Sequence, residues 1–344
     1  MNPRPLVLPV SLVIPAFRAE ALIAAAIGSV TEASCVPAEI VVVDDASPDR
    51  TGEVAAALGA RVLRLPRNAG PAAARNAGVA AATQPWVAFL DADDAWLDGK
   101  LSAQWDALQR RPGAGLCFTD YDTVFANGDV RASELCGDAD YARVTVVERA
   151  GAAVLLEPAS FARAFVRSMF VRQSSVLVDR AIYLRLGGYD EELRLAEDYE
   201  FFLRLIAAAP ALAIERRLVA YRRQATSLSN DPLAQIASID RLWSAALARP
   251  ERYSAAAVEQ IRRQRPATLR KGCVRALFLG RFPAAADFAR RALAMRRSAL
   301  TVALLGIASL LDSRPGRFAF RTVRAAWRAR PGALRRGGAA EHAA

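Results

Sequence analysis

Short apolar runs alternate with helix-type patterns along the first hundred residues of the chain. The apolar runs predict buried strands at residues 10–14, 39–43, 61–65 and 86–90. Between them, residues 19–30, residues 51–58 and the alanine-rich stretch after Gly70 have the composition and spacing of helices. Strands that alternate with helices in this way predict a doubly wound α/β layer around a parallel or mixed sheet.

Acidic residues directly follow two of these predicted strands. Asp44 and Asp45 come after the second strand, and Asp91, Asp93 and Asp94 come after the fourth. In open α/β sheets, ligands bind beyond the carboxyl ends of the strands. Carboxylates suit Mg²⁺ or Mn²⁺, ions that one or two protein acids hold while substrate phosphates supply further ligands. On these acids alone, a solvated acidic turn before the helix that begins near residue 97 is an equally good interpretation.

Two further side chains have both a structural and a functional interpretation. Arg75, in the alanine-rich helix, can bind a phosphate through two hydrogen bonds, but a solvated helix residue would look the same. Later in the chain, residues 116–120 and 174–178 predict strands, residues 127–149 a loop and residues 180–186 a short helix. Asp198 precedes an apolar helical pattern, which places it at a helix N-terminus, where it could simply cap that helix.

Composition indicates a folded protein with a distinct C-terminal region. The chain has 344 residues, of which 53% are hydrophobic and 24% charged, enough for an α/β core and something smaller. The net charge of +11 is uneven, since 20 basic and five acidic residues lie from Glu251 onward. We therefore predict an α/β domain at residues 1–230, to which the resemblance described below gives the catalytic role, and a basic, mostly helical region at residues 231–344.

The C-terminal helices leave two interpretations open. Residues 277–293 resemble a single tetratricopeptide-like helix pair, and residues 298–311 and 317–328 combine apolar and basic residues. Such helices either lie on an anionic membrane face or pack as a small bundle with their arginines in solvent.

Three observations predict a cytoplasmic protein, with peripheral contact at the inner membrane face as a variant. The cysteines lack metal-type spacing and fit a reduced compartment, with two long-range disulfides as the alternative; they are Cys35, Cys117, Cys136 and Cys273. Residues 1–9 lack the apolar core of a secretory signal. The longest apolar run, residues 299–311, is shorter than the about 20 residues that cross a bilayer.

Taken together, five stretches resemble the nucleotide-sugar-dependent glycosyltransferases of family 2. They are Val-Ile-Pro-Ala-Phe (13–17), Ile-Val-Val-Val-Asp-Asp-Ala-Ser (40–47), Asn-Ala-Gly with Ala-Arg-Asn-Ala-Gly (68–70, 74–78), Phe-Leu-Asp-Ala-Asp-Asp (89–94) and Gly-Gly-Tyr-Asp with Glu-Asp-Tyr (187–190, 197–199). The resemblance implies a GT-A (Rossmann-like) fold, with a mixed central sheet flanked by helices and a C-terminal helical extension. It also implies sugar transfer from a nucleotide-diphosphate donor, UDP-linked in our prediction, to a glycan or lipid-linked acceptor of the bacterial cell envelope.

The resemblance implies a donor-binding role for residues near the strand ends. The nucleotide site would be lined by Pro15, Ala16, Phe17 and Glu20. Asp44 or Asp45 would hydrogen-bond the base or the ribose, whereas Gly70 and Arg75 would lie near the diphosphate.

The resemblance also implies which residues carry the chemistry. Asp93 would bind Mn²⁺ or Mg²⁺ directly, and Asp91 would be a second ligand, nearer the ribose. Asp198 would be the general base of an inverting transfer, taking the proton from an acceptor hydroxyl as it attacks the anomeric carbon. The metal and Arg75 would neutralise the charge that builds on the leaving diphosphate.

One position departs from the family pattern. In the segment 221–229, relatives often have a histidine that completes the metal site, whereas this chain has Gln224, and its single histidine is His342. This departure motivates an alternative function, a nucleotide-sugar-binding relative with weakened catalysis. A nucleic-acid-binding protein, suggested by the pI near 10.2, is disfavoured because the basic residues lack interleaved aromatics and recognisable motifs.

Overall fold

The computed structural model describes residues 4–193, 195–223, 231–296 and 298–313. By its internal contacts the chain forms two compact units: one contains Met1–Asn230 and Leu242–Ile261, the other Asp231–Arg241 and Arg262–Ala344. The first unit thus includes a segment beyond residue 230, and the predicted domain boundary at that position stays a prediction. Gln224 and the predicted helix at residues 317–328 lie outside the described residues.

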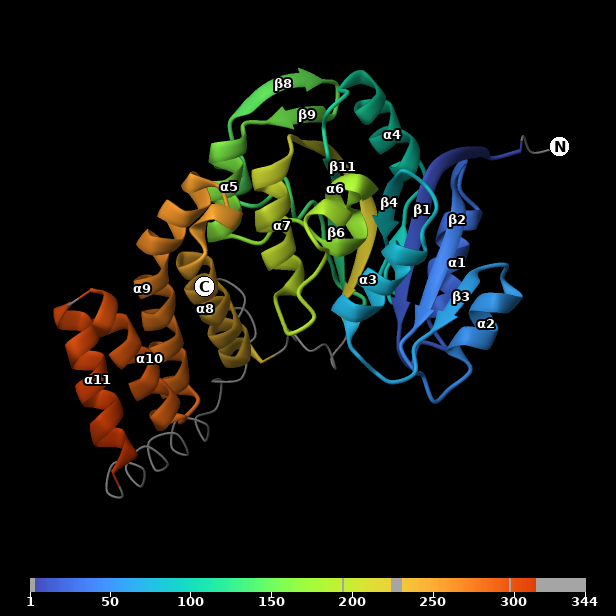
Figure 1. The fold of residues 1–344 in the computed structure, drawn as a ribbon. Coiled ribbons are helices and arrows are strands. Elements are labelled where there is room, and N and C mark those ends of the chain that lie inside the picture. The colour runs from blue at the N-terminus through green and yellow to red at the C-terminus, as the bar shows by residue number, and fades with distance from the viewer. Residues whose placement is uncertain (1–3, 194, 224–230, 297, 314–344) are drawn as a thin grey trace. The chain divides into compact units, whose positions relative to one another are not determined.

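A mixed sheet forms the centre of the first unit (Figure 1). Its eleven strands in the described chain are β1 (Leu6–Ala16), β2 (Cys35–Asp44), β3 (Arg61–Arg64), β4 (Trp86–Phe89), β5 (Ala95–Trp96), β6 (Leu116–Phe125), β7 (Val130–Arg131), β8 (Val146–Ala150), β9 (Ala153–Leu156), β10 (Leu177–Asp179) and β11 (Ala211–Arg223). The main order is β3-β2-β1-β4-β10-β6-β11-β9-β8. Neighbours among β1 to β4 pair in parallel, β10 runs antiparallel to β4 and β6, and β11 runs parallel to β6. The carboxyl ends of β1, β2, β3, β4, β6 and β11 therefore meet at one edge of the sheet.

Helices flank this sheet, as predicted for a doubly wound layer (Figure 1). They are α1 (Ile23–Thr31), α2 (Thr51–Ala57), α3 (Pro71–Ala81), α4 (Lys100–Arg110), α5 (Pro158–Arg167), α6 (Arg180–Arg185) and α7 (Glu197–Ala208). The four predicted N-terminal strands are confirmed, and the central residues of β1, β2 and β4 are fully buried and apolar. Helix α1 begins at Ile23, later than predicted, and before it the backbone N–H of Ala19 donates to the Thr51 hydroxyl at 2.8 Å.

Three predictions in the middle of the chain differ from the structure. The predicted loop at 127–149 contains β7, a 3₁₀ turn and most of β8, and the predicted strand at 174–178 is a 3₁₀ turn (Gln173–Ser175) followed by β10. The sequence pattern did not predict β11. Charged residues 215–217 interrupt its apolar alternation where its pairing with β6 shifts register, a feature typical of β-bulges.

Glycine at position 78 allows α3 to lie directly on the sheet. A Cβ atom there would come within 2.4 Å of Val13 Cγ1 and 3.1 Å of Val43 Cγ2. The Asn-Ala-Gly stretch of α3 is therefore explained by close helix–sheet packing, and it fixes the height of α3 over the ends of β1 and β2.

A lysine is buried in the core of the first unit. The Nζ atom of Lys100 donates to Gln104 Oε1 at 2.8 Å and lies 3.9 Å from the centroid of the Trp96 ring, and the residue is only 1% exposed. Burial disfavours the charged amine and lowers the pKa of Lys100 to about 7. The Trp96 indole in turn donates to the carbonyl of Ser174 at 2.8 Å, so this packing supports the residues next to the acidic loop.

The second unit is helical in its described residues. It takes the first part of α8 (Pro232–Ala248), most of α9 (Ala255–Phe278), and all of α10 (Phe282–Met295) and α11 (Ala299–Asp312). Its core includes Leu269, Phe288 and Leu304. Asp240 is fully buried in it and pairs with Arg265 at 2.6 Å and with Arg291.

None of the described helices combines the length and apolar character that crossing a membrane requires. All four cysteines are free thiols in this structure.

We expect Gly78→Ala to destabilise the protein by about 1 to 3 kcal/mol, because the added methyl group overpacks the contact between α3 and β1. The measurement is the free energy of unfolding in urea. Gly28→Ala in α1 is the matched control, since its Cβ would meet only Glu32 Oε1 at 3.6 Å. An equal effect of both substitutions would contradict the packing argument.

We expect Lys100→Met to stabilise the protein most at neutral or lower pH. The unfolded lysine stays charged up to its ordinary pKa of 10.5, whereas the folded one loses its proton above about pH 7. The stability of the natural protein therefore rises with pH between these values, and the methionine variant lacks this rise. The gain should be about 2 to 4 kcal/mol at pH 7, allowing for the partner that Gln104 loses, and should shrink towards pH 10. Exposed Lys271→Met is the control, and a pH-independent difference would refute this account.

Candidate active site

Hydrogen bonds hold the loop after β1 against the loop after β2. The backbone N–H of Asp45 donates to the carbonyl of Ala16 at 2.9 Å, and the Glu20 carboxylate accepts the N–H of the residue before α2 at 3.1 Å. Arg18 and Ala46 within these loops adopt left-handed backbone conformations, with φ of 52° and 58°. Such conformations are costly for residues other than glycine and gather at functional sites.

Both carboxylates at the end of β2 bind protein groups. Asp44 is fully buried and accepts a hydrogen bond from Arg64 Nη1 at 3.1 Å. Asp45 accepts the backbone N–H groups of Ala69 at 2.7 Å and Gly70 at 2.8 Å. Gly70 has a φ of 91°, which suits glycine, and α3 begins at the next residue. The observed contacts of Asp44 and Asp45 thus shape the loops, and their predicted contact with a base or ribose stays a prediction.

The acidic loop after β4 (residues 91–94) is held from two sides. Asp94 is 1% exposed, and its carboxylate accepts the Ser174 hydroxyl at 2.5 Å and the backbone N–H of Arg222 at 2.8 Å. The same Ser174 oxygen accepts the N–H of Asp91 at 3.0 Å. Asp94 therefore serves as the anchor of the loop, which leaves Asp91 and Asp93 as its ligand-facing candidates.

The carboxylate of Asp93 accepts no hydrogen bond from another residue of the described chain. Only its backbone carbonyl accepts one, from Arg222 Nη1 at 3.4 Å. Burial, with a further contribution from the charge of Asp91, raises the pKa of Asp93 to about 6. A bound cation would offset both effects.

Arg75 connects the acidic loop to α7. Its Nη2 donates to Asp91 Oδ1 at 2.8 Å and its Nη1 to Glu197 Oε1 at 3.1 Å, and the residue is 5% exposed. Burial opposes the charge, but Asp91 and Glu197 outweigh it and raise the pKa of Arg75. The guanidinium also lies 5.6 Å from the ring centroid of Tyr189. This bridge brings together two acidic segments that are more than 100 residues apart in sequence.

The predicted acidic start of α7 is confirmed. Ala196 precedes the helix with a φ of 66°, and Glu197 and Asp198 form its first turn. Burial raises the pKa of Glu197 to about 7, helped by Asp198 and opposed by Arg75. Asp198 is half-buried, and its Oδ1 accepts the N–H of Tyr199 at 2.8 Å.

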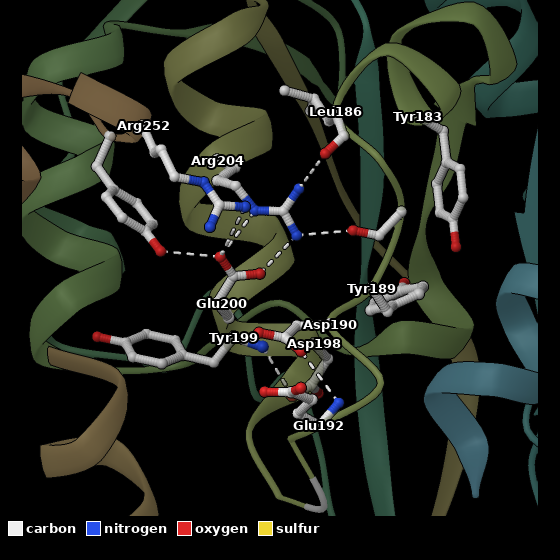
Figure 2. Close-up of polar contacts among 12 residues, drawn as sticks. Tyr183, Leu186, Tyr189, Asp190, Glu192, Asp198, Tyr199, Glu200, Arg204 and Arg252 are labelled. Atoms are coloured by element: carbon white, nitrogen blue, oxygen red, sulfur yellow. Dashed lines mark hydrogen bonds and ion pairs between the residues drawn. The ribbon is translucent and has the colours of Figure 1, made fainter. Parts of the chain in front are cut away.

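A buried ion pair fixes the turn that leads into α7 (Figure 2). Arg204 pairs with Glu200 at 2.5 Å and donates to the carbonyls of Leu186 at 2.6 Å and Gly188 at 2.7 Å. Glu200 also accepts the Tyr253 hydroxyl at 2.8 Å. Because every member of this network has partners, it holds the Gly187–Gly188 turn and the first turn of α7 in one arrangement.

A second contact joins that turn to α3. The Asn76 amide donates to the carbonyl of Tyr189 at 2.9 Å, and its oxygen accepts the Tyr183 hydroxyl at 2.6 Å. A Cβ atom at Gly188 would come within 2.4 Å of this oxygen. The Asn-Ala-Gly and Gly-Gly-Tyr-Asp stretches are therefore neighbours in the fold.

The predicted site residues lie at one edge of the sheet. One group lies at or just beyond the carboxyl ends of β1 to β3 and consists of Pro15, Ala16, Phe17, Glu20, Asp44, Asp45 and Gly70. The other is joined by Arg75 and contains Asp91, Asp93 and Asp198. Sequence reasoning gave no role to Ser174 or Glu197. The two serines at the start of the predicted strand at 174–178 were an available signal for Ser174, whereas the partner of Glu197 could be found only in the fold.

The side chains of this site fit a divalent metal only if the ligand and water complete its coordination. Across the parts of the chain that the structure describes, no three His, Cys, Asp or Glu side chains gather as a metal site. Asp91 and Asp93 are the hard oxygen donors of the acidic loop that remain once Asp94 anchors it, and a cation would stabilise the carboxylate of Asp93. Two protein ligands suffice for an ion that takes the rest from phosphate and water.

Comparison with known proteins finds a family model and several relatives that match part of the chain. The model of "Glycosyl transferase family 2" matches residues 11–141. Succinoglycan biosynthesis protein ExoO of Rhizobium meliloti is 30% identical over 217 residues, which are 60% of this chain and 58% of that protein. In Escherichia coli, the UDP-Glc:alpha-D-GlcNAc-diphosphoundecaprenol beta-1,3-glucosyltransferase WfgD is 36% identical over 124 residues, 35% of this chain and 49% of that protein. The chain spans less than two thirds of the length of these relatives.

Solved structures show the same fold. The crystal structure of S. aureus TarS 1-349 in complex with UDP-GlcNAc has a TM-score of 0.62 at 16% identity, over 92% of both chains. Its complex with UDP has a TM-score of 0.59 at 16% identity, over 92% of this chain and 91% of that one. The resemblance and the fold predicted from the sequence are thus confirmed: residues 11–141 match glycosyl transferase family 2, and the chain has the GT-A fold.

Proposed function

We propose that the first unit is an inverting glycosyltransferase, which transfers a sugar from a UDP-linked donor to a glycan or lipid-linked acceptor of a bacterial envelope polysaccharide. The observation that carries this proposal is the Arg75 bridge, because it brings the Asp91–Asp93 loop and the Glu197–Asp198 turn to one edge of the sheet. The names of two relatives support it: ExoO is named for succinoglycan biosynthesis, and WfgD for a UDP-glucose donor and a lipid diphosphate acceptor.

On the donor side, we assign Asp93 and Asp91 to a divalent ion. When bound, Mn²⁺ or Mg²⁺ would neutralise charge on the diphosphate and so make it a better leaving group. Both terminal nitrogens of Arg75 already pair with carboxylates, so its proposed first task is to position Asp91 against Glu197. Direct contact of Arg75 with the diphosphate would require one of these pairs to rearrange.

On the acceptor side, we assign the general base to Asp198. Its Oδ1 accepts an N–H of its own helix, and no described residue donates to Oδ2. The acceptor hydroxyl would give its proton to this oxygen while its own oxygen bonds to the anomeric carbon. The bond from that carbon to the donor phosphate breaks, and its electron pair leaves with the diphosphate. The network around Glu200 and Arg204 supports this role by fixing the first turn of α7.

Two predictions about the rest of the chain stay open. The alternative of a donor-binding relative with weakened catalysis rests on Gln224, which the structure does not describe. Peripheral membrane contact is supported by the exposed apolar side chains of α11, Leu300, Ile307 and Leu310, together with the basic C-terminal sequence. Co-sedimentation with vesicles of anionic lipid would test this contact.

We expect Asp198→Asn to lower turnover by about 10²- to 10⁴-fold without weakening donor binding, because only proton removal is lost. The assay incubates the protein with radiolabelled nucleotide sugars, Mn²⁺ and lipid-linked acceptors, and follows nucleotide release. Glu192→Gln, on an exposed turn near Asp198 (Figure 2), is the control. Unchanged turnover in Asp198→Asn would show that another residue is the general base. If the natural protein releases nucleotide from no common donor, the transferase proposal itself is refuted.

We expect Asp93→Asn to weaken Mn²⁺ binding in the presence of UDP by at least about 100-fold, since outer-shell partners alone contribute about 10- to 100-fold. Calorimetric titration with Mn²⁺ measures this. Because protons compete for a carboxylate whose pKa is about 6, the affinity of the natural protein should also fall as the pH drops through that value. Exposed Asp106→Asn is the control, and equal Mn²⁺ affinity in both variants would exclude Asp93 as a ligand.

A further inference from the structure

Arg172 is a cation at the sheet edge that sequence reasoning did not single out. Its guanidinium carbon lies 5.6 Å from the ring centroid of Tyr121 on β6 and 5.1 Å from that of Tyr221 on β11. The two rings meet edge to face at 6.3 Å, so the arginine is held over a pair of aromatic side chains. Its Nε is buried and has no hydrogen-bond partner.

Arg172 also differs from the other buried arginines of the first unit in having no carboxylate partner. Arg75 and Arg204 have carboxylate oxygens at 2.5 to 3.1 Å, whereas no Asp or Glu oxygen of the described chain lies within ion-pair distance of Arg172. The residues outside the described chain contain a single acid, Glu341. Arg172 therefore has no carboxylate in direct contact, and the groups that favour its charge are the side chains of Tyr121 and Tyr221 and the more distant Asp198.

The position of Arg172 relates it to both halves of the candidate site. Two residues later, Ser174 binds the acidic loop through Asp91 and Asp94. On the other side, Tyr221 directly precedes the residue whose N–H donates to Asp94. Asp198 is the carboxylate whose charge acts on Arg172, although no hydrogen bond joins them. Arg172 thus lies near the acidic loop and near the proposed base.

An unpaired buried guanidinium costs free energy, and an anion of the ligand would offset that cost. Guanidinium groups match phosphate oxygens with two parallel hydrogen bonds, and the aromatic pair below Arg172 restricts its orientation before a ligand arrives. We propose that Arg172 is a further substrate-binding residue, whose guanidinium pairs with a diphosphate group of the substrate. The proposal rests on the transfer function proposed above. The diphosphate belongs either to the nucleotide donor or to a lipid-linked acceptor.

The experiment compares the natural protein with Arg172→Met and Arg172→Lys by calorimetric titration in the presence of Mn²⁺. The probes are UDP and farnesyl diphosphate, with uridine and farnesol as their uncharged counterparts. We expect Arg172→Met to weaken the binding of one or both diphosphates by about 10- to 100-fold. The binding of uridine and farnesol should not change. Arg172→Lys should lie between, because it keeps the charge and loses the planar fork. Loss confined to UDP assigns the contact to the donor, and loss confined to farnesyl diphosphate assigns it to the acceptor.

Thermal unfolding separates binding from a structural role. Removing an unpaired buried charge should leave the melting temperature of Arg172→Met unchanged or raise it. If Arg172→Met has a lower melting temperature and binds uridine and UDP with equally reduced affinity, Arg172 is structural and the proposal is overturned. Exposed Arg110→Met is the matched control and should match the natural protein with every probe.

The outcomes for Arg172 and for the transfer function are distinguishable. Sugar transfer by the natural protein, with both diphosphates bound equally by Arg172→Met, would refute the role of Arg172 and keep the function. If UDP binding depends on Arg172 but no donor supports transfer, the role of Arg172 is kept and the transfer function is refuted. Failure of the natural protein to bind either diphosphate would also overturn the Arg172 proposal.

Discussion

The candidate site depends on one buried cation, the guanidinium of Arg75. Asp91 and Glu197 belong to segments that the sequence separates widely, and both carboxylates are at least partly removed from water. Without a shared counter-ion they would repel each other and pay the cost of desolvation alone. Because Arg75 projects from α3, which Gly78 allows to lie directly on β1, the packing of the helix and the geometry of the acids are parts of one arrangement.

The charge balance at this edge explains why a cation fits there. Arg75 compensates Asp91 and Glu197, whereas Asp93 receives no such partner from the described chain. Burial and neighbouring acids raise the pKa of Asp93 to about 6 and that of Glu197 to about 7, so negative charge is less favourable at this edge than in water. A nucleotide diphosphate is itself anionic, so its binding beside these acids requires added positive charge. A divalent ion and the unpaired guanidinium of Arg172 would supply it from two sides.

Sequence patterns predicted the parts of this site that local rules determine. Strand ends and helix starts depend on neighbouring residues, so the positions of Asp91, Asp93 and Asp198 on their elements followed from the apolar pattern. Contacts such as that between Ser174 and Asp94, 80 residues apart, depend on the order of strands in the sheet, which periodicity does not encode. Strand β11 was missed for a related reason, because its register shifts place charged residues where alternation predicts apolar ones.

The site concentrates features that cost stability. Ala46 and Ala196 take left-handed backbone conformations beside the proposed nucleotide site and the proposed base. The Nε atoms of Arg75 and Arg172 and the amide nitrogen of Gln173 are buried without partners. Evolution removes such defects from a core where nothing is gained by keeping them, whereas binding and catalysis need groups whose partners arrive with the substrate. The clustering of strain and unpaired nitrogen along one sheet edge is therefore an argument for function that does not depend on any family resemblance.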